Sequence, residues 1–181
     1  LRPPRRRSAS AERLLSPGRL RAMEASEWPA EPAERVRLLV ERVLDELDLD
    51  GEVEMDETDD VITATVEGDE DYGLLIGRRG QTIDALQLLA FQAAFRGIRE
   101  RKRVVVDAAG YRARREEVIS ERADRAAEKA IASGSEVELD PMSARERRIV
   151  HEHLKSRPEV ETFSSGDDPH RRVVIAPLIT E

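Results

Sequence analysis

A short glycine–arginine sequence between an apolar segment and a helical pattern constrains this chain more than any other feature. Residues 77–80 read Gly-Arg-Arg-Gly, directly after Leu-Leu-Ile at 74–76. Beyond them, apolar residues recur at steps of three and four, at Ile83, Leu86, Ala90 and Ala93, with Leu89 alongside. The pattern predicts a short apolar turn, a tight cationic loop, and a helix over about residues 81–95.

Such a loop is suited to holding a phosphodiester backbone. Because glycine has no Cβ, an anionic chain can approach the main-chain N–H groups of the loop, and the start of the helix also favours negative charge. Arg78 and Arg79 add guanidinium groups that match phosphate oxygens. We expect Ile76 and Ile83 to form an apolar floor for bases. The alternative is an ordinary turn between helices, because a four-residue motif is short.

The charge distribution favours this location. The net charge of −8 argues against a polyanionic partner, but residues 34–73 hold 16 acids and 3 bases, whereas residues 77–103 hold 7 bases and 2 acids. Salt screens exposed charges beyond about 10 Å, so the local field decides where an anion binds. The basic block contains the loop, and we therefore expect nucleic acid to bind only there.

The composition excludes several classes of protein. The chain has 181 residues and no cysteine, which excludes disulfides, thiolate zinc sites and cysteine nucleophiles, and suits a reducing cytoplasm. Aromatic residues are only 3%, so base stacking on aromatic platforms is not expected. Neither a membrane-spanning run nor a signal peptide is apparent. We predict a cytoplasmic protein that is not an enzyme, with no cofactor, no metal and no membrane insertion.

The pattern of apolar residues predicts an α+β protein of two modules. The first, over residues 34–108, has the order αββααβ, with a helix at 32–47, strands at 52–55 and 61–66 joined by Asp59-Asp60, the two helices around the loop, and a strand at 102–106. The second, over residues 135–181, has the order βαββ, with strands at 136–139, 160–164 and 171–176. Its helix begins at Ser143, with Glu146 completing a capping box.

A long charged helix over about residues 110–132 is predicted to connect the modules, within a segment at 109–134. Its apolar residues are Tyr111, Val118, Ala126 and Ile131, which are too sparse for a deep core face. We expect a surface-packed connector whose charges form i,i+4 pairs rather than a binding site.

The second module carries a weaker constellation. Arg147 and His151 lie four residues apart and share a helix face, and the final strand opens with His170, Arg171 and Arg172. We expect these groups to contact phosphates. Metal binding is disfavoured, since His153 points away from His151. The structural alternative is that Arg147 only pairs with a nearby acid and His151 supports local packing.

Residues 1–33 are predicted to be a disordered tail, because arginines lie there among prolines and serines. One hypothesis is that the natural product starts at Met23 and lacks Leu1–Ala22. The alternative is a genuine basic tail that adds nonspecific affinity for phosphate.

The ordered motifs resemble known families. The αββα-loop-αβ order with Ile76-Gly-Arg-Arg-Gly-Gln-Thr82 resembles a prokaryotic-type KH domain. Met142-Ser-Ala144 before Arg147…His151, with Val160-Glu-Thr-Phe-Ser164 and Pro169-His-Arg-Arg-Val173 after it, resembles the Arg-xxx-His single-strand-binding domain. Together, over about residues 34–177, the two modules resemble the bacterial Jag family, also called KhpB.

The resemblance implies a cytoplasmic RNA-binding regulator linked to cell elongation and envelope growth, with a small KH-only protein as partner. The RNA-binding residues that it implies are Ile76, Gly77, Arg78, Arg79, Gly80 and Gln81 in the KH clamp, which spans about four nucleotides, and Arg147 and His151 as the signature pair of the second module. We expect no counterpart of the family's N-terminal Jag domain within residues 1–33, which puts any function of that domain, membrane association included, in doubt.

We therefore predict single-stranded RNA as the partner. Two alternatives remain open. One is a protein-interaction adaptor that docks through the acidic first helix and hairpin, and the other is single-stranded DNA binding.

Overall fold

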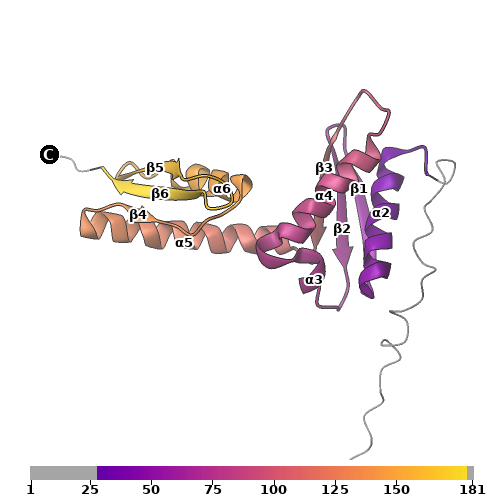
Figure 1. The fold of residues 1–181 in the computed structure, drawn as a ribbon, viewed down its shortest axis with the longest axis horizontal. Helices are drawn as coiled ribbons and strands as arrows, with labels where there is room; N and C mark the ends of the chain where they lie inside the picture. The colour runs from indigo at the N-terminus through magenta and orange to yellow at the C-terminus, as the bar shows by residue number, and fades with distance from the viewer. Residues whose placement is uncertain (1–27, 179–181) are drawn as a thin grey trace, which may run out of the picture.

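The computed structural model describes residues 28–178 and contains two α+β modules that share one long helix (Figure 1). Residues 1–27 lie outside the described part, and the hypothesis about Leu1–Ala22 falls there. Within the predicted tail, Pro32 and Ala33 already form the first turn of a helix. Among the described residues, no helix is long and apolar enough to cross a membrane.

The first module has the predicted αββααβ order. Its elements are α2 (Pro32–Leu47), β1 (Glu52–Glu57), β2 (Val61–Glu67), α3 (Gly73–Ile76), the 3₁₀ turn η2 (Arg78–Gly80), α4 (Gln81–Ala94) and β3 (Arg103–Ala108). The sheet order is β1-β2-β3, with β1 antiparallel and β3 parallel to β2. β3 is therefore an edge strand, and it leads directly into the next helix.

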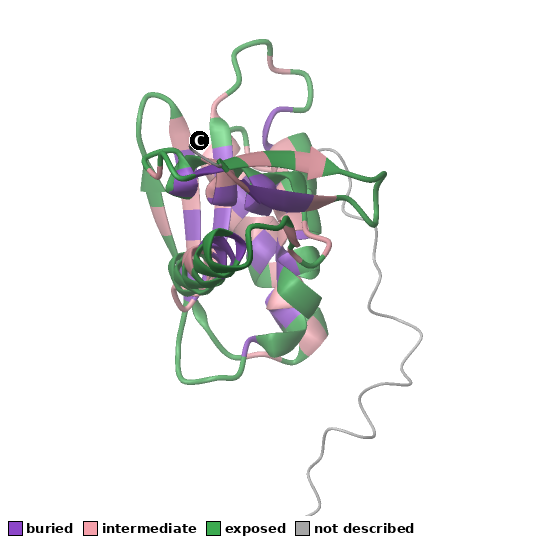
Figure 2. Cartoon of the chain, turned by 90° about the vertical axis from the view of Figure 1, so that its left-hand side faces the viewer, coloured by how far each residue is buried: buried purple, intermediate pink, exposed green. Residues whose placement is uncertain are grey.

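One face of this sheet carries the core. Alternate residues of β2 and β3, such as Ile62, Ala64, Val104 and Val106, are buried against α2 and α4. Both helices pack on this same face, so the loop at the start of α4 lies beside the sheet and not above its centre (Figure 1). Buried residues are concentrated on the inner faces of helices and strands (Figure 2).

Two expectations about α4 are wrong. Ile83 is fully buried in the core, so it cannot serve as a floor for bases. Leu89 is 59% exposed, because the buried face of the helix runs through Leu86, Ala90 and Ala94 instead. The sequence left the helix phase ambiguous, since nearly every residue from 85 to 95 is apolar or small.

The second module is built on α5 (Tyr111–Ser133). Its other elements are β4 (Val137–Glu138), α6 (Ala144–Leu154), β5 (Val160–Ser165) and β6 (Arg172–Pro177). β6 is the central strand of a three-stranded antiparallel sheet of order β4-β6-β5. Helices α5 and α6 pack against it, and the predicted βαββ order is confirmed.

Helix α5 is more than a surface-packed connector, which corrects the sequence interpretation. Ile119, Ala123, Ala126, Ala127 and Ala130 are buried in the second core, together with residues of α6 and β6. Small alanines let the strand and helix approach closely, and their low hydrophobicity hid this face in the sequence. The predicted domain boundaries themselves stay a prediction.

A buried ion pair fastens α5 to α6. Ser143 caps α6 and forms the predicted capping box with Glu146. The same Glu146 carboxylate accepts from Arg115 of α5, at 2.8 Å from Nε and 2.6 Å from Nη2. Glu146 is only 6% exposed, so this carboxylate stabilises the helix start and the contact between the helices.

We expect Glu146→Gln to reduce the free energy of unfolding by about 1–3 kcal/mol, because glutamine preserves the capping box but leaves Arg115 without a counter-charge. Glu146→Ala should cost about 1 kcal/mol more, through loss of the cap. Urea denaturation measures both. Glu152→Gln, at an exposed position of the same helix, is the control and should stay within about 0.5 kcal/mol of the wild type; equal effects of the three variants would contradict the assignment.

Candidate nucleic-acid interface

The loop between α3 and α4 has a conformation that needs its glycines. Gly77 has φ 72° and Gly80 has φ 81°, a region that L-residues rarely occupy. A side chain at Gly77 would also collide with Thr82, and one at Gly80 would meet the Tyr111 hydroxyl at 2.8 Å. Arg79 adopts a left-handed conformation between them, with φ 55°. The backbone therefore folds into a tight turn that directs Arg78 and Arg79 outward.

The loop has one covered side and one open side. Gly80 is buried beneath Tyr111, the first residue of α5, whereas Arg78 and Arg79 are exposed and Gly77 is half-buried. Burial raises the pKa of the Tyr111 hydroxyl, so this group stays neutral. No side chain of the described residues caps the start of α4. First-turn N–H groups that the 3₁₀ turn does not use therefore remain for an anion.

The two arginines differ in their contacts. Arg78 has no ion pair with another described residue. Arg79 reaches the second module, where Nη1 donates to the carbonyl oxygen of Pro141 at 2.8 Å and Nη2 lies 3.6 Å from the Asp140 carboxylate. No sequence pattern indicated this contact, because the partners are 61 and 62 positions apart.

A groove runs along the edge of the first sheet beside α4. It has a volume of about 240 Å³ and is lined by Asp84, Gln87, Leu88, Phe91, Arg103 and Val104. Leu88 is 60% exposed although it is apolar. The groove thus offers an apolar surface with polar groups at its margin, and sequence analysis missed it because its residues come from two distant segments.

Main-chain groups of the edge strand face this groove. Arg103 and Ala109 donate to carbonyl oxygens of Asp60 and Val66 on the β2 side. Since hydrogen bonds alternate along a parallel strand, Val104 and Val106 direct their N–H and C=O groups away from β2. Gln87 and Arg112 satisfy those of Val106. The groups of Val104 are left to meet whatever lies in the groove.

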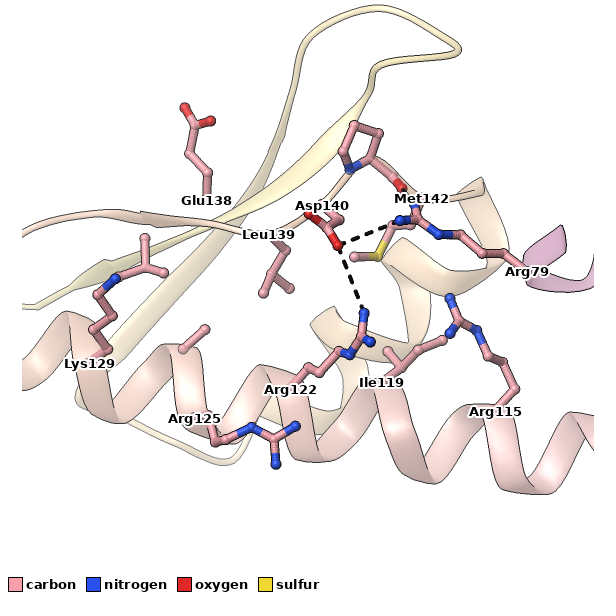
Figure 3. Close-up of a pocket in the computed structure, with 13 residues that line it drawn as sticks. Arg79, Arg115, Ile119, Arg122, Arg125, Lys129, Glu138, Leu139, Asp140 and Met142 are labelled. Atoms are coloured by element: carbon pink, nitrogen blue, oxygen red, sulfur yellow. Dashed lines mark hydrogen bonds and ion pairs between the residues drawn. The ribbon is translucent and has the colours of Figure 1, made fainter.

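A larger cleft of about 400 Å³ lies between α5 and the segment that joins β4 to α6 (Figure 3). Its charged lining consists of Arg79, Arg115, Arg122, Arg125, Lys129, Glu138 and Asp140. Figure 3 shows Arg79 and Arg122 approaching Asp140 from opposite sides, at 3.6 Å and 3.8 Å. The cleft is therefore cationic, with one carboxylate near its centre.

Arg147 and His151 do not form the flat cationic surface expected from the sequence. Arg147 is only 7% exposed, and its Nη1 donates to the carbonyl oxygen of Met142 and pairs with Asp168 at 3.4 Å. The half-buried His151 ring bridges to β5, with Nδ1 2.7 Å from the Thr162 hydroxyl and Nε2 3.2 Å from the Ser164 hydroxyl. Both residues hold the second module together.

The remaining predicted residues divide by exposure. Gln81, His170 and Arg171 are exposed and Ile76 is half-buried. Arg172 pairs with Glu138 at 2.8 Å across the sheet. Among the described residues, no ion pair joins the segment at 170–172 to the helix that carries Arg147. Within residues 28–178, no group of three or more His, Cys, Asp or Glu residues is arranged to hold a metal ion.

The fold and the glycine loop define a protein with a KH module followed by an Arg-xxx-His module, and comparison with known proteins agrees. The family model described as "KhpA/KhpB, KH domain" matches residues 33–107. The family model of the Arg-xxx-His domain matches residues 117–177, and it includes most of α5. This extent agrees with the contribution of α5 to the second core.

Curated relatives share both modules. They include proteins named RNA-binding protein KhpB from Clostridium symbiosum (37% identity, covering 76% of this chain and 62% of the relative), Lactiplantibacillus plantarum (44%, 58% and 32%) and Bacillus subtilis (30%, 81% and 71%). The chain belongs to the KhpB (Jag) family. It spans less than two thirds of the length of the first two relatives.

His151 should make the stability of the second module depend on pH. Burial, and next the charge of Arg147, lower the pKa of its imidazole below the ordinary value of about 6.5. The neutral ring therefore stabilises the fold above about pH 6.5, and this contribution is lost as the pH falls through the folded-state pKa. The difference in unfolding free energy between the wild type and His151→Gln should shrink on acidification. Urea denaturation across this range tests it; a difference that grows in acid would contradict the assignment.

Proposed function

We propose that this protein binds single-stranded RNA, mainly through the sugar–phosphate backbone, and acts as a binding protein rather than an enzyme. The observation that carries the proposal is the loop at residues 77–80, whose inner side is covered by Tyr111 while its outer side presents Arg78 and uncapped helix N–H groups. A backbone phosphate fits this combination of donors. The relatives' names, RNA-binding protein KhpB, support the same ligand.

A single strand fits better than a duplex. The groove beside β3 adjoins the loop through Asp84, which lines both the groove and the gap beneath Gly80. Its apolar lining, Leu88 and Phe91, can contact the face of an unstacked base, and the free main-chain groups of Val104 can hydrogen-bond a base edge. Bases in a duplex are already paired and stacked, so they could not enter.

The contribution of the second module remains part of the proposal. His170 and Arg171 are exposed and can meet phosphates directly. Arg147, His151 and Arg172 are engaged with other residues. We propose that they contact RNA only at their exposed margins and otherwise fix the shape of this surface.

The biological role that we propose is post-transcriptional regulation in the cytoplasm, linked to cell elongation and envelope growth, with a small KH-only protein as a partner. It rests on membership of the KhpB (Jag) family. Crosslinking of the protein to RNA in cells, followed by sequencing, would identify the transcripts. Gel filtration of a lysate with and without RNase distinguishes an RNA binder from an adaptor, since only adaptor complexes survive RNase.

Arg78→Asp should weaken binding of a short oligouridylate by about tenfold or more, because a free guanidinium at the loop is replaced by a carboxylate that repels phosphate. The slope of log affinity against log salt should fall by about 0.7, the value for one phosphate contact on a single strand. Lys155→Asp makes a comparable charge change at an exposed site on the second module and should preserve affinity. Fluorescence anisotropy measures all three proteins; an unchanged affinity of Arg78→Asp would remove the loop from the mechanism. Matched DNA oligomers test the single-stranded DNA alternative.

Leu88→Asn should weaken the same binding by about fivefold, since it removes an apolar contact of about 1 kcal/mol from the groove. Leu89→Asn is the matched control, because Leu89 is the adjacent residue, is equally exposed and does not line the groove. Equal effects of the two substitutions on affinity would exclude the groove as the base-binding surface.

A further inference from the structure

The cleft in Figure 3 is lined by one stripe of α5. Arg115, Arg122 and Lys129 recur every seven residues on this stripe, with Ile119 and Ala126 between them. Seven residues are two helical turns, so the three cations are spaced about 10.5 Å apart along the helix. The stripe points into a hollow and not into open solvent, which distinguishes it from the solvated charge pattern expected from the sequence.

The acidic residues of α5 do not neutralise this stripe. Asp124 is engaged on the side of the second module, 2.9 Å from His153 and 3.5 Å from Arg157. Glu121 lies 3.5 Å from the exposed Arg125, the only i,i+4 ion pair of α5 within the described residues. The carboxylates that line the cleft are Glu138, which pairs with Arg172, and Asp140.

The cations of the stripe differ in availability. Arg115 is committed to the buried Glu146. Arg122 is half exposed and its distance to Asp140 is 3.8 Å, which makes a weak pair. Lys129 is exposed and has no ion pair among residues 28–178. Arg122 and Lys129 are thus the two α5 side chains that a new anion would meet at the lowest cost.

The cleft is continuous with the loop. Arg79 belongs to the loop and also lines the cleft, where it meets Asp140 and Pro141 of the second module. A strand that leaves the outer side of the loop therefore passes directly to the mouth of the cleft.

We propose that this cleft is a second binding site for the nucleic-acid backbone, in which Arg122 and Lys129 hold phosphates of the same single strand that the loop grips. The inference rests on the proposed function and extends it: one strand engages both modules along α5. Asp140 occupies the phosphate position in the free protein by pairing with Arg79 and Arg122. Strand binding displaces this carboxylate and releases both guanidinium groups to the phosphates.

The length of the strand separates the two sites experimentally. An oligouridylate of about five nucleotides fills the KH clamp, which spans about four, whereas one of about 16 nucleotides reaches beyond it. In fluorescence anisotropy at about 0.1 M salt, Arg122→Gln/Lys129→Gln should bind the longer oligomer about tenfold more weakly and the shorter one as the wild type does. For the longer oligomer, the salt slope should fall by about 1.4, the value for two phosphate contacts.

A matched double substitution controls for net charge. Arg42→Gln/Lys155→Gln also removes one arginine and one lysine, at residues outside the cleft and the loop. It should leave both affinities unchanged. Asp140→Asn should have the opposite effect to the cleft variant and tighten the longer oligomer about two- to fivefold, by removing a competing surface pair.

Each outcome decides the matter. If the cleft variant keeps wild-type affinity for the longer oligomer, the cleft site is wrong and the loop remains the binding site. Equal weakening for both oligomers would mean that the cleft residues only support the loop, which also overturns the second site. If the wild-type protein binds neither oligomer, the proposed function fails and the cleft site fails with it. Circular dichroism confirms that each variant is folded.

Discussion

The contact between Gly80 and Tyr111 is the constraint on which the rest of the structure depends. It closes the inner side of the loop and places the first residue of α5 directly behind the residues that would bind a phosphate. Since α5 then runs without interruption into the second core, the position of the loop also fixes the position of the second module. Arg79 completes this arrangement from the loop side by donating to Pro141. A side chain at position 80 would separate these parts, so the glycine is needed for the assembly of the modules as much as for the approach of a ligand.

An acidic protein can present a cationic surface because its charges are sorted by element. The acids concentrate on α2, the β1–β2 hairpin and the turn before Tyr72, where burial, and next the nearby carboxylates, raise the pKa of the Tyr72 hydroxyl. The loop and the cleft stripe of α5 carry the bases. With screening over about 10 Å, a polyanion at the loop experiences the local bases and not the net charge of −8. The acidic part repels nonspecific contacts elsewhere.

The sequence predicted most of the fold because its signals are local. The helix at 32–47, the hairpin at Asp59-Asp60 and the capping box of Ser143 and Glu146 are all confirmed, and each depends on residues within a few positions. The wrong predictions concern choices that only tertiary packing makes. The phase of α4 and the burial of alanines in α5 depend on which face meets a sheet. The groove at β3 and the pairing of Arg79 with Asp140 join residues far apart in the chain, and no sequence pattern marks them.

A shared rigid helix changes what two weak binding surfaces can achieve. If the modules were joined by a flexible linker, binding at the second site would require ordering of the linker, and its entropy cost would offset much of the gain. Here α5 belongs to the core of the second module and packs against the first at Gly80, so the two sites are held at a fixed distance. A strand bound at the loop then meets the cleft as an intramolecular partner at high effective concentration. Exposed arginines and lysines worth about 1 kcal/mol or less each can therefore contribute substantially when they act together.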